Sequence, residues 1–90
     1  MILSFRCSDT EALAGGRRIA RFSRIESIAR RKLRQIQIAE RLADLRVPPG
    51  NRLEKLKGDR AGQYSIRVND RFRVCFGWSA AGAKDVEIVD

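Results

Sequence analysis

The chain contains no histidine, and this absence limits the chemistry that its side chains can perform. A Ser-His-Asp triad, a Cys-His pair and any zinc site with histidine ligands are excluded. Cys7 and Cys75 are too few and too far apart for a zinc cluster, and each lies in an apolar, strand-like run. Small buried thiols are the favoured interpretation, and a disulfide is the alternative. Any reaction must use carboxylates, Arg, Lys, Tyr or backbone groups, and no sequence spacing indicates a metal or a cofactor.

The chain also lacks a long hydrophobic run. No apolar segment approaches the ~20 residues that a membrane-spanning helix needs. The short apolar stretch Met1–Phe5 is followed by polar residues, unlike a signal peptide. We therefore expect a cytoplasmic protein with no membrane partner. Ninety residues allow one modest core, so residues 1–90 are predicted to form a single domain without a deep cofactor cleft.

Negative charge is scarce. Nineteen Lys and Arg residues stand against eleven Asp and Glu residues, which gives a net charge of +8. Fifteen of the nineteen are arginine, whose planar fork of donors suits phosphate groups. A polyanionic partner is expected, with nucleic acid ahead of a membrane surface.

Hydrophobic periodicity predicts the first half of the fold. Ile2–Cys7 alternates like a half-buried strand. The Ser-x-x-Glu spacing of Ser8–Glu11 predicts a short helix that ends at Gly15-Gly16. The same spacing at Ser23–Glu26 opens a longer helix with an apolar stripe, which should stop near Leu45 because a proline pair follows.

The second half is predicted to be mostly strand. Apolar and polar residues alternate over residues 63–69 and 71–78, and the turn signal Asn69-Asp70 joins the two runs into a hairpin. Residues 52–62 are expected to be irregular or weakly extended. After a turn over 79–84, a final strand contains Val86 and Ile88. The order β-α-α-β-β-β predicts an α+β fold with two N-terminal helices on a mainly antiparallel sheet.

One face of the predicted hairpin is rich in arginine. Arg71 and Arg73 share this face, and strand pairing brings a third arginine near them. The functional interpretation is an anion platform, and the alternative is a solvated face with salt bridges to Asp70 or Glu87. Tyr64 and Trp78 share the parity of the core residues, which favours the core over base stacking. The basic residues expected on or beside the platform are Arg67, Arg71, Arg73, Lys57 and Arg60.

If RNA lies on this platform, a ribose 2′-hydroxyl can attack the adjacent phosphate. Arg73 and Arg71 are suited to stabilise charge on the phosphorane. Periodicity does not fix the direction of Asp90. The candidates for proton transfer are Asp90, Glu87, Glu54, Lys57 and Tyr64.

A second basic region lies upstream, where residues 17–34 hold eight basic residues and one acidic residue, Glu26. This cluster is interpreted as a surface for ribosomal RNA or an acidic partner. The alternative is a solubilising helix face. Arg30, Arg31 and Arg34 are the predicted RNA or ribosome contacts of this helix.

Several segments, in order and spacing, resemble the HigB-type killer toxins of the RelE superfamily, close to the GraT-like branch. A weaker match at Ile2–Phe5, Asp9–Glu11 and the central helix extends the likeness over most of the chain. The strongest matching segments are Pro48–Glu54, Leu56–Gln63, Ser65–Asp70, Phe72–Phe76 and Val86–Asp90.

The resemblance implies a ribosome-dependent, metal-independent mRNA endoribonuclease of a type II toxin-antitoxin pair, which cuts mRNA in the ribosomal A site and so inhibits translation. It also implies a cognate HigA-like antitoxin with a helix-turn-helix, through which alone the toxin reaches operator DNA. Carried over by position, Lys57, Arg73 and Asp90 match the family's functional positions. The implied RNA or ribosome contacts are Arg60, Arg67, Asn69 and Arg71.

Two departures from the family pattern bear on catalysis. Family members usually continue past the aspartate with Tyr-His, whereas this chain ends at Asp90, and Glu54 replaces a histidine that some members use. Cleavage then relies on Arg, Lys and carboxylates, or this form is truncated and impaired; loss of the tail is the expectation. Two other classes stay open: a non-catalytic module that blocks the A site, and a corepressor that acts through its antitoxin.

Overall fold

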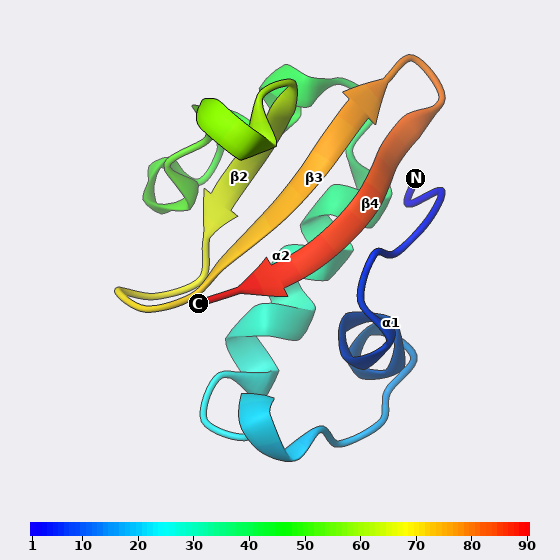
Figure 1. Cartoon of the computed structure of the whole chain (residues 1–90), viewed down its shortest axis with the longest axis vertical. Helices are drawn as coiled ribbons and strands as arrows, with labels where there is room; N and C mark the ends of the chain where they lie inside the picture. The colour runs from blue at the N-terminus through cyan, green and yellow to red at the C-terminus, as the bar shows by residue number, and fades with distance from the viewer.

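A four-stranded antiparallel sheet with the order β1-β2-β3-β4 forms one layer of the molecule, and α2 lies behind it (Figure 1). The computed structural model describes the whole chain, residues 1–90. The predicted α+β class, with two N-terminal helices on a mainly antiparallel sheet, is confirmed. The helices are α1 (Ser8–Ala14) and α2 (Glu26–Ile38), and the strands are β1 (Glu54–Lys55), β2 (Gln63–Arg67), β3 (Arg73–Ser79) and β4 (Gly82–Val89). Four 3₁₀ turns complete the chain: η1 (Ala20–Phe22), η2 (Leu42–Arg46), η3 (Pro49–Asn51) and η4 (Gly58–Arg60).

The core lies between α2 and the inner face of the sheet. Ala29, Leu33 and Ile36 recur at three- and four-residue steps along α2 and are all buried. They join one cluster with inward-facing strand residues such as Ile66 and Phe76. Tyr64 and Trp78 are half-buried and pack against this cluster, as their parity predicted. Burial of each large side chain contributes about 1.5–3 kcal/mol, so the residues of the inner face serve the stability of the fold.

The second helix is shorter than predicted. It begins at Glu26, with Ile25 rather than Ser23 at the N-cap and no side-chain cap, and it ends at Ile38 instead of near Leu45. The early end has a local cause, because the Oδ2 atom of Asp44 accepts hydrogen bonds from two preceding backbone N–H groups, at 3.0 Å each. These bonds stabilise the separate turn η2, from which Leu45 still reaches the core.

The N-terminal segment is not the strand that alternation predicted. It lies along β4 and makes two isolated parallel bridges, Ile2 to Ala83 and Phe5 to Val86. A bulge interrupts the register of β4 against β3, and Asp85 there has a positive φ of 53°. Because the bulge bends the edge of the sheet, a continuous ladder with the N-terminal segment cannot form.

The hairpin between β2 and β3 is confirmed, and its turn is held by one side chain. The Oδ1 atom of Asn69 accepts hydrogen bonds from the backbone N–H groups of Arg71 and Phe72, at 2.9 and 2.7 Å. The following turn is tighter than predicted, since β4 already begins at Gly82. Gly82 has a φ of 140°, and a Cβ there would lie 2.2 Å from the carbonyl oxygen of Met1, so only glycine fits.

None of the helices is long and apolar enough to cross a membrane.

Candidate functional site

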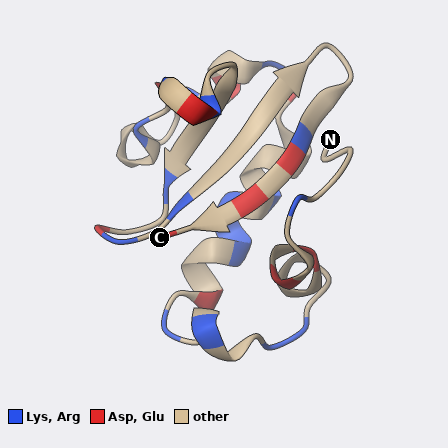
Figure 2. Ribbon diagram, viewed as in Figure 1, with Lys and Arg blue, Asp and Glu red and all other residues tan.

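Strand register arranges the outer face of the sheet in two cross-strand rows. The upper row contains Glu54, Ser65, Cys75 and Glu87, one residue from each strand. In the lower row, next to the hairpin turn, Arg67 lies opposite Arg73. Figure 2 shows these basic ends of β2 and β3, with acidic residues farther along β4.

Directly opposed arginines repel each other, because side chains at paired positions of an antiparallel sheet have Cβ atoms only about 4.5–5.5 Å apart. Arg67 forms an ion pair with Asp70 in the turn. Arg73 is exposed and makes no ion pair or side-chain hydrogen bond. The pair therefore has an excess of positive charge that an anion bound between the two strands would relieve.

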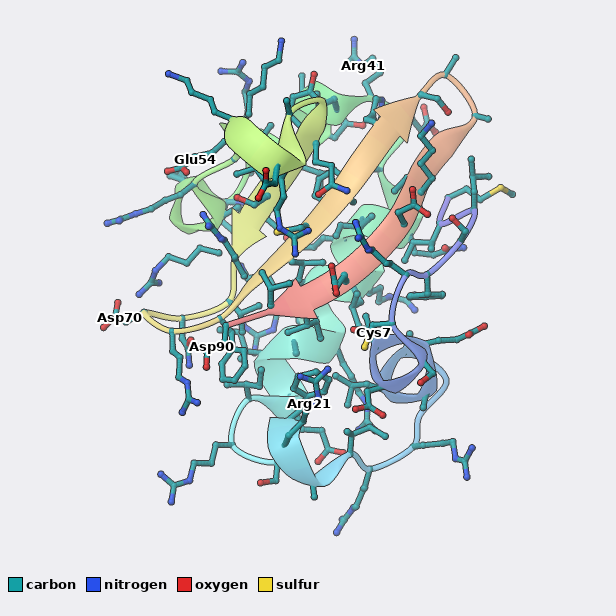
Figure 3. The ribbon with its side chains drawn as sticks, in the orientation of Figure 1. Cys7, Arg21, Arg41, Glu54, Asp70 and Asp90 are labelled. Carbon is teal, nitrogen blue, oxygen red and sulfur yellow. The ribbon has the colours of Figure 1, made fainter.

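These arginines line an open cleft of about 340 Å³ at the turn end of the outer face. Four arginines and three carboxylates surround it, with one apolar residue, Phe72. Figure 3 shows two of the carboxylates, Asp70 and Asp90, at this end of the sheet, and the third, Glu54, farther up beside β2. The lining residues are Arg52, Glu54, Ser65, Arg67, Asn69, Asp70, Arg71, Phe72, Arg73 and Asp90.

Asp90, whose direction periodicity left open, lies at the cleft and pairs with Arg71. The Nε and Nη2 atoms of Arg71 each lie 2.9 Å from its Oδ2 atom. Both side chains are more than half exposed, at 70% and 57%, and ion pairs this exposed contribute little to stability. A phosphate group can therefore replace Asp90 as the partner of Arg71 at small cost.

Arg60 and Lys57 are not part of this cleft. The guanidinium of Arg60 lies across the upper row, where its Nη1 and Nη2 atoms donate to Gln63 and Glu87, each at 3.1 Å. Cys75 is fully buried in that row, and burial raises the pKa of its thiol despite the nearby guanidinium groups. Lys57 is exposed at the start of η4. The predicted platform thus includes Arg67, Arg71 and Arg73, and η4 closes over its other end.

The predicted contacts of α2 lie behind the sheet, away from the cleft. Arg30 is held within the fold, because its Nε and Nη2 atoms donate to the carbonyl oxygens of Leu13 and Arg17 and it also pairs with Glu26 at 3.0 Å. Arg31 and Arg34 are exposed. Contact of these three arginines with RNA or the ribosome stays a prediction.

Arg52 lines the cleft and directly follows a buried polar network that the sequence did not indicate. Asn51 is fully buried, and its amide donates to Gln35 at 2.9 Å and to the carbonyl oxygen of Leu45 at 3.1 Å. Its Oδ1 atom accepts a hydrogen bond from Lys32, which is only 7% exposed. Burial, with the charges of Arg31 and Arg67, lowers the pKa of Lys32. The network anchors η3, after which Arg52 takes a left-handed conformation with φ of 45°.

Sequence reasoning missed Arg52, Ser65 and Phe72 as parts of the site. Residues 52–62 show no regular period, so the pairing of Glu54 with Ser65 could not be foreseen. Strand β1 has only two residues, too few to show an alternation in the sequence. The two cysteines are free thiols; Cys75 is buried and Cys7 half-buried.

Residues 15–90 match the family model for HigB-like toxins, which are described as RelE-like toxins of the type II toxin-antitoxin system HigB. The chain belongs to the HigB-like toxin family. All residues that line the cleft fall within the matched segment. The resemblance inferred from the sequence motifs is thereby confirmed.

Two curated relatives of this HigB-like chain align over part of their lengths. The chain is similar to Toxin HigB-1 of Vibrio cholerae serotype O1, with 48% identity over 56 residues, which cover 62% of this chain and 59% of the relative. It is also similar to an uncharacterized protein of Haemophilus influenzae, with 41% identity over 54 residues, or 60% and 54% of the two chains. The chain thus spans less than two thirds of the length of either relative.

Proposed function

We propose that this HigB-like chain is the toxin of a type II toxin-antitoxin pair and cuts mRNA in the ribosomal A site, with the scissile phosphate in the cleft. The main support is the direct opposition of Arg67 and Arg73 across the hairpin, in which Arg73 has no counter-ion. Two forked guanidinium groups facing one open cavity suit a phosphodiester better than an apolar ligand.

The cleft offers a group for each step of an attack by the 2′-hydroxyl. Glu54 is the one lining carboxylate without an ion pair, so it accepts the proton of the 2′-hydroxyl. The 2′-oxygen then forms a bond to phosphorus while the bond to the 5′-oxygen breaks, and Arg73 stabilises the charge on the phosphorane. Asp90, at the end of the opposite edge strand, stays a carboxylate and orients a water molecule, which gives a proton to the 5′-oxygen. The hydroxide left behind takes the proton held by Glu54. The products are a 2′,3′-cyclic phosphate and a 5′-hydroxyl.

The other basic residues at or near the cleft serve as ligands of the RNA phosphates in this proposal. Arg67, Arg71 and Arg52 line the cleft, and Lys57 lies outside it as an outer contact for the RNA chain. Ribosomal RNA is the second partner. A HigA-like helix-turn-helix antitoxin neutralises the toxin in the cytoplasm and carries it to operator DNA.

The decisive experiment maps mRNA 5′ ends on translating ribosomes incubated with the wild-type protein and with Arg73→Ala. We expect new 5′ ends with the wild type and a loss of about 10²- to 10³-fold with Arg73→Ala, as for removal of one donor to a charged transition state. Arg46→Ala is the matched control, because Arg46 is exposed, does not line the cleft and forms no ion pair. Undiminished cleavage by Arg73→Ala would overturn the assignment.

A second function, blockage of the A site without cleavage, is favoured by one observation. Two of the three cleft carboxylates, Asp70 and Asp90, are engaged with arginines, which leaves Glu54 alone as a free proton acceptor. The same experiment separates the two functions. A blocker would stop peptide synthesis in a purified translation system and leave every message intact.

A further inference from the structure

A second depression lies beside the cleft and shares a wall with it. It has a volume of about 240 Å³ and is bounded by the segment around η1 on one side and by Arg71 and Phe72 of the hairpin turn on the other. Both of these turn residues also line the cleft. The two depressions therefore meet at the turn, although η1 and the turn are far apart in the sequence (Figure 1).

The charges around this second depression are all of one sign. Arg21, Arg24 and Arg71 line it, together with Ser23, and no carboxylate does. Arg24 is exposed and forms no ion pair or hydrogen bond. Arg21 pairs with Asp9 at 3.0 Å, but both side chains are about half exposed, so that pair is weak. The cleft carries three carboxylates among its four arginines, whereas no carboxylate lines this depression. Arg21 and Arg71 have exposed partners outside it, Asp9 and Asp90, so Arg24 is its one unpaired arginine.

The walls of the depression are fixed relative to each other by aromatic contacts. The rings of Phe22 and Phe72 meet edge to face, with centroids 6.1 Å apart. The guanidinium of Arg21 lies 4.3 Å from the centre of the Phe22 ring, and that of Arg71 lies 5.2 Å from the centre of the Phe72 ring. These cation–π contacts hold one arginine at each wall. In Figure 3, Arg21 lies below and to the right of Asp90, on the side of Cys7.

We propose that this depression is a second phosphate subsite, which binds the phosphodiester of a nucleotide flanking the one in the cleft, on the same RNA strand. The inference rests on the proposed function, since it assumes that RNA occupies the cleft. Arg71 lies between the two subsites and contacts the phosphate on either side, while Arg24 and Ser23 hold the flanking phosphate. The substrate is thereby a single strand that passes over the hairpin turn toward η1.

The test measures how binding of single-stranded RNA depends on salt concentration. Two probes are used, a dinucleotide and a longer oligonucleotide, both 2′-O-methylated so that they cannot be cut. Each phosphate contact with a single strand contributes about 0.7 to the slope of log K against log salt. For Arg24→Ala we expect the slope for the longer probe to fall by about 0.7, with no change for the dinucleotide. Arg24→Lys should restore most of the slope because it keeps the charge.

Arg18→Ala is the matched control, because Arg18 is an exposed arginine that precedes η1 and lines neither depression. If Arg24→Ala and Arg18→Ala behave alike on the longer probe, the subsite does not exist. An equal loss on both probes would also overturn it, since Arg24 would then act on the cleft at a distance. Binding of the same variants to ribosomes is measured as well. A loss seen with ribosomes and with neither RNA probe would assign the phosphate to ribosomal RNA and overturn the proposal.

Arg73→Ala keeps the two proposals distinguishable. If it weakens binding of both probes while Arg24→Ala weakens neither, the cleft stands as an RNA site and the second subsite fails. If Arg73→Ala also has no effect on either probe, RNA does not bind in the cleft, and the proposed function fails with it.

Discussion

An arginine lies at each of the two rows on the outer face of the sheet, and the two arginines are engaged in opposite ways. In the lower row, Arg73 faces Arg67 across the hairpin and has no counter-ion. At the upper row, which contains the buried Cys75, Arg60 reaches over from η4 and donates hydrogen bonds to Gln63 and Glu87. Arg73 is exposed to solvent, whereas Arg60 links η4 to the outer face of the sheet.

This contrast shows that the number of arginines does not identify the site. An arginine whose guanidinium already donates to two acceptors has few donors free for a ligand. An arginine that lies opposite another positive charge is stabilised by a bound anion. The same holds for the carboxylates of the upper row. Glu54 at one end has no partner, and Glu87 at the other end is paired at 3.1 Å.

The largest effect is expected when each of these two glutamates is replaced by glutamine and the two variants are compared. Glu54→Gln removes the free proton acceptor of the cleft and should lower mRNA cleavage by about 10² to 10⁴, the range for loss of a general base, without a change in stability. Glu87→Gln should leave cleavage largely intact and weaken the fold. Ribosome cleavage assays and denaturant unfolding of both variants check this. Equal cleavage by Glu54→Gln and the wild type would remove Glu54 from the mechanism.

A large effect on stability is expected where the cleft is anchored. Asn51→Ala leaves the buried ammonium of Lys32 and the carbonyl oxygen of Leu45 without their partner. The free energy of unfolding should fall by about 2–3 kcal/mol, because each unsatisfied buried group costs about 1–3 kcal/mol. Urea unfolding measures the change. Asn69→Ala, which loosens an exposed turn, is the comparison, and an equal loss there would show that burial of Asn51 is unimportant.

A moderate effect separates Arg60 from Arg73. Arg60→Ala should lower the free energy of unfolding by about 1–2 kcal/mol, since its two partly buried hydrogen bonds are lost. Arg73→Ala should change it by less than about 0.5 kcal/mol, as for a surface site without contacts. Thermal and urea unfolding of the two variants decide the matter. The contrast between the rows breaks down if Arg73→Ala proves the more destabilising.

The smallest effect is a dependence on pH that comes from Lys32. Because the pKa of Lys32 is lowered in the folded protein, the unfolded chain binds more protons in the window between that value and the ordinary lysine value of about 10.4. The contribution of Lys32 to the free energy of unfolding therefore rises with pH through this window. Unfolding of the wild type and of Lys32→Met at neutral and alkaline pH should show the wild type gaining relative to the variant. A constant difference would contradict the lowered pKa.

Long periodic segments made most of the fold predictable from sequence. The alternation over β2 and β3 was long enough to give the hairpin, its core face and its arginine face, and the family motifs covered the same residues. The predictions for short or interrupted segments were wrong. Alternation at Ile2–Cys7 suggested a strand, but the bulge at Asp85 in its neighbour, nearly eighty residues away, allows only two bridges. The apolar stripe continued past Ile38, but a side chain of η2 ended the helix there.

The site was predictable to the extent that it lies on those long strands. Arg67, Arg71 and Arg73 were placed correctly beside one another. The pairing of Arg60 with Glu87 depends on where η4 folds back, and the position of Arg52 depends on the buried Asn51 before it. Both are tertiary contacts with no local signature in the sequence.

The turn that Asn69 holds together has a mechanical role, because it is the dividing wall between two neighbouring depressions. The side chain of Asn69 braces this wall from within, by accepting two backbone hydrogen bonds. A rigid divider fixes the distance between the two depressions, so that a chain lying across both is held at a set spacing. The five residues between β2 and β3 thus set the spacing of the two depressions, and Asn69 holds these residues in place.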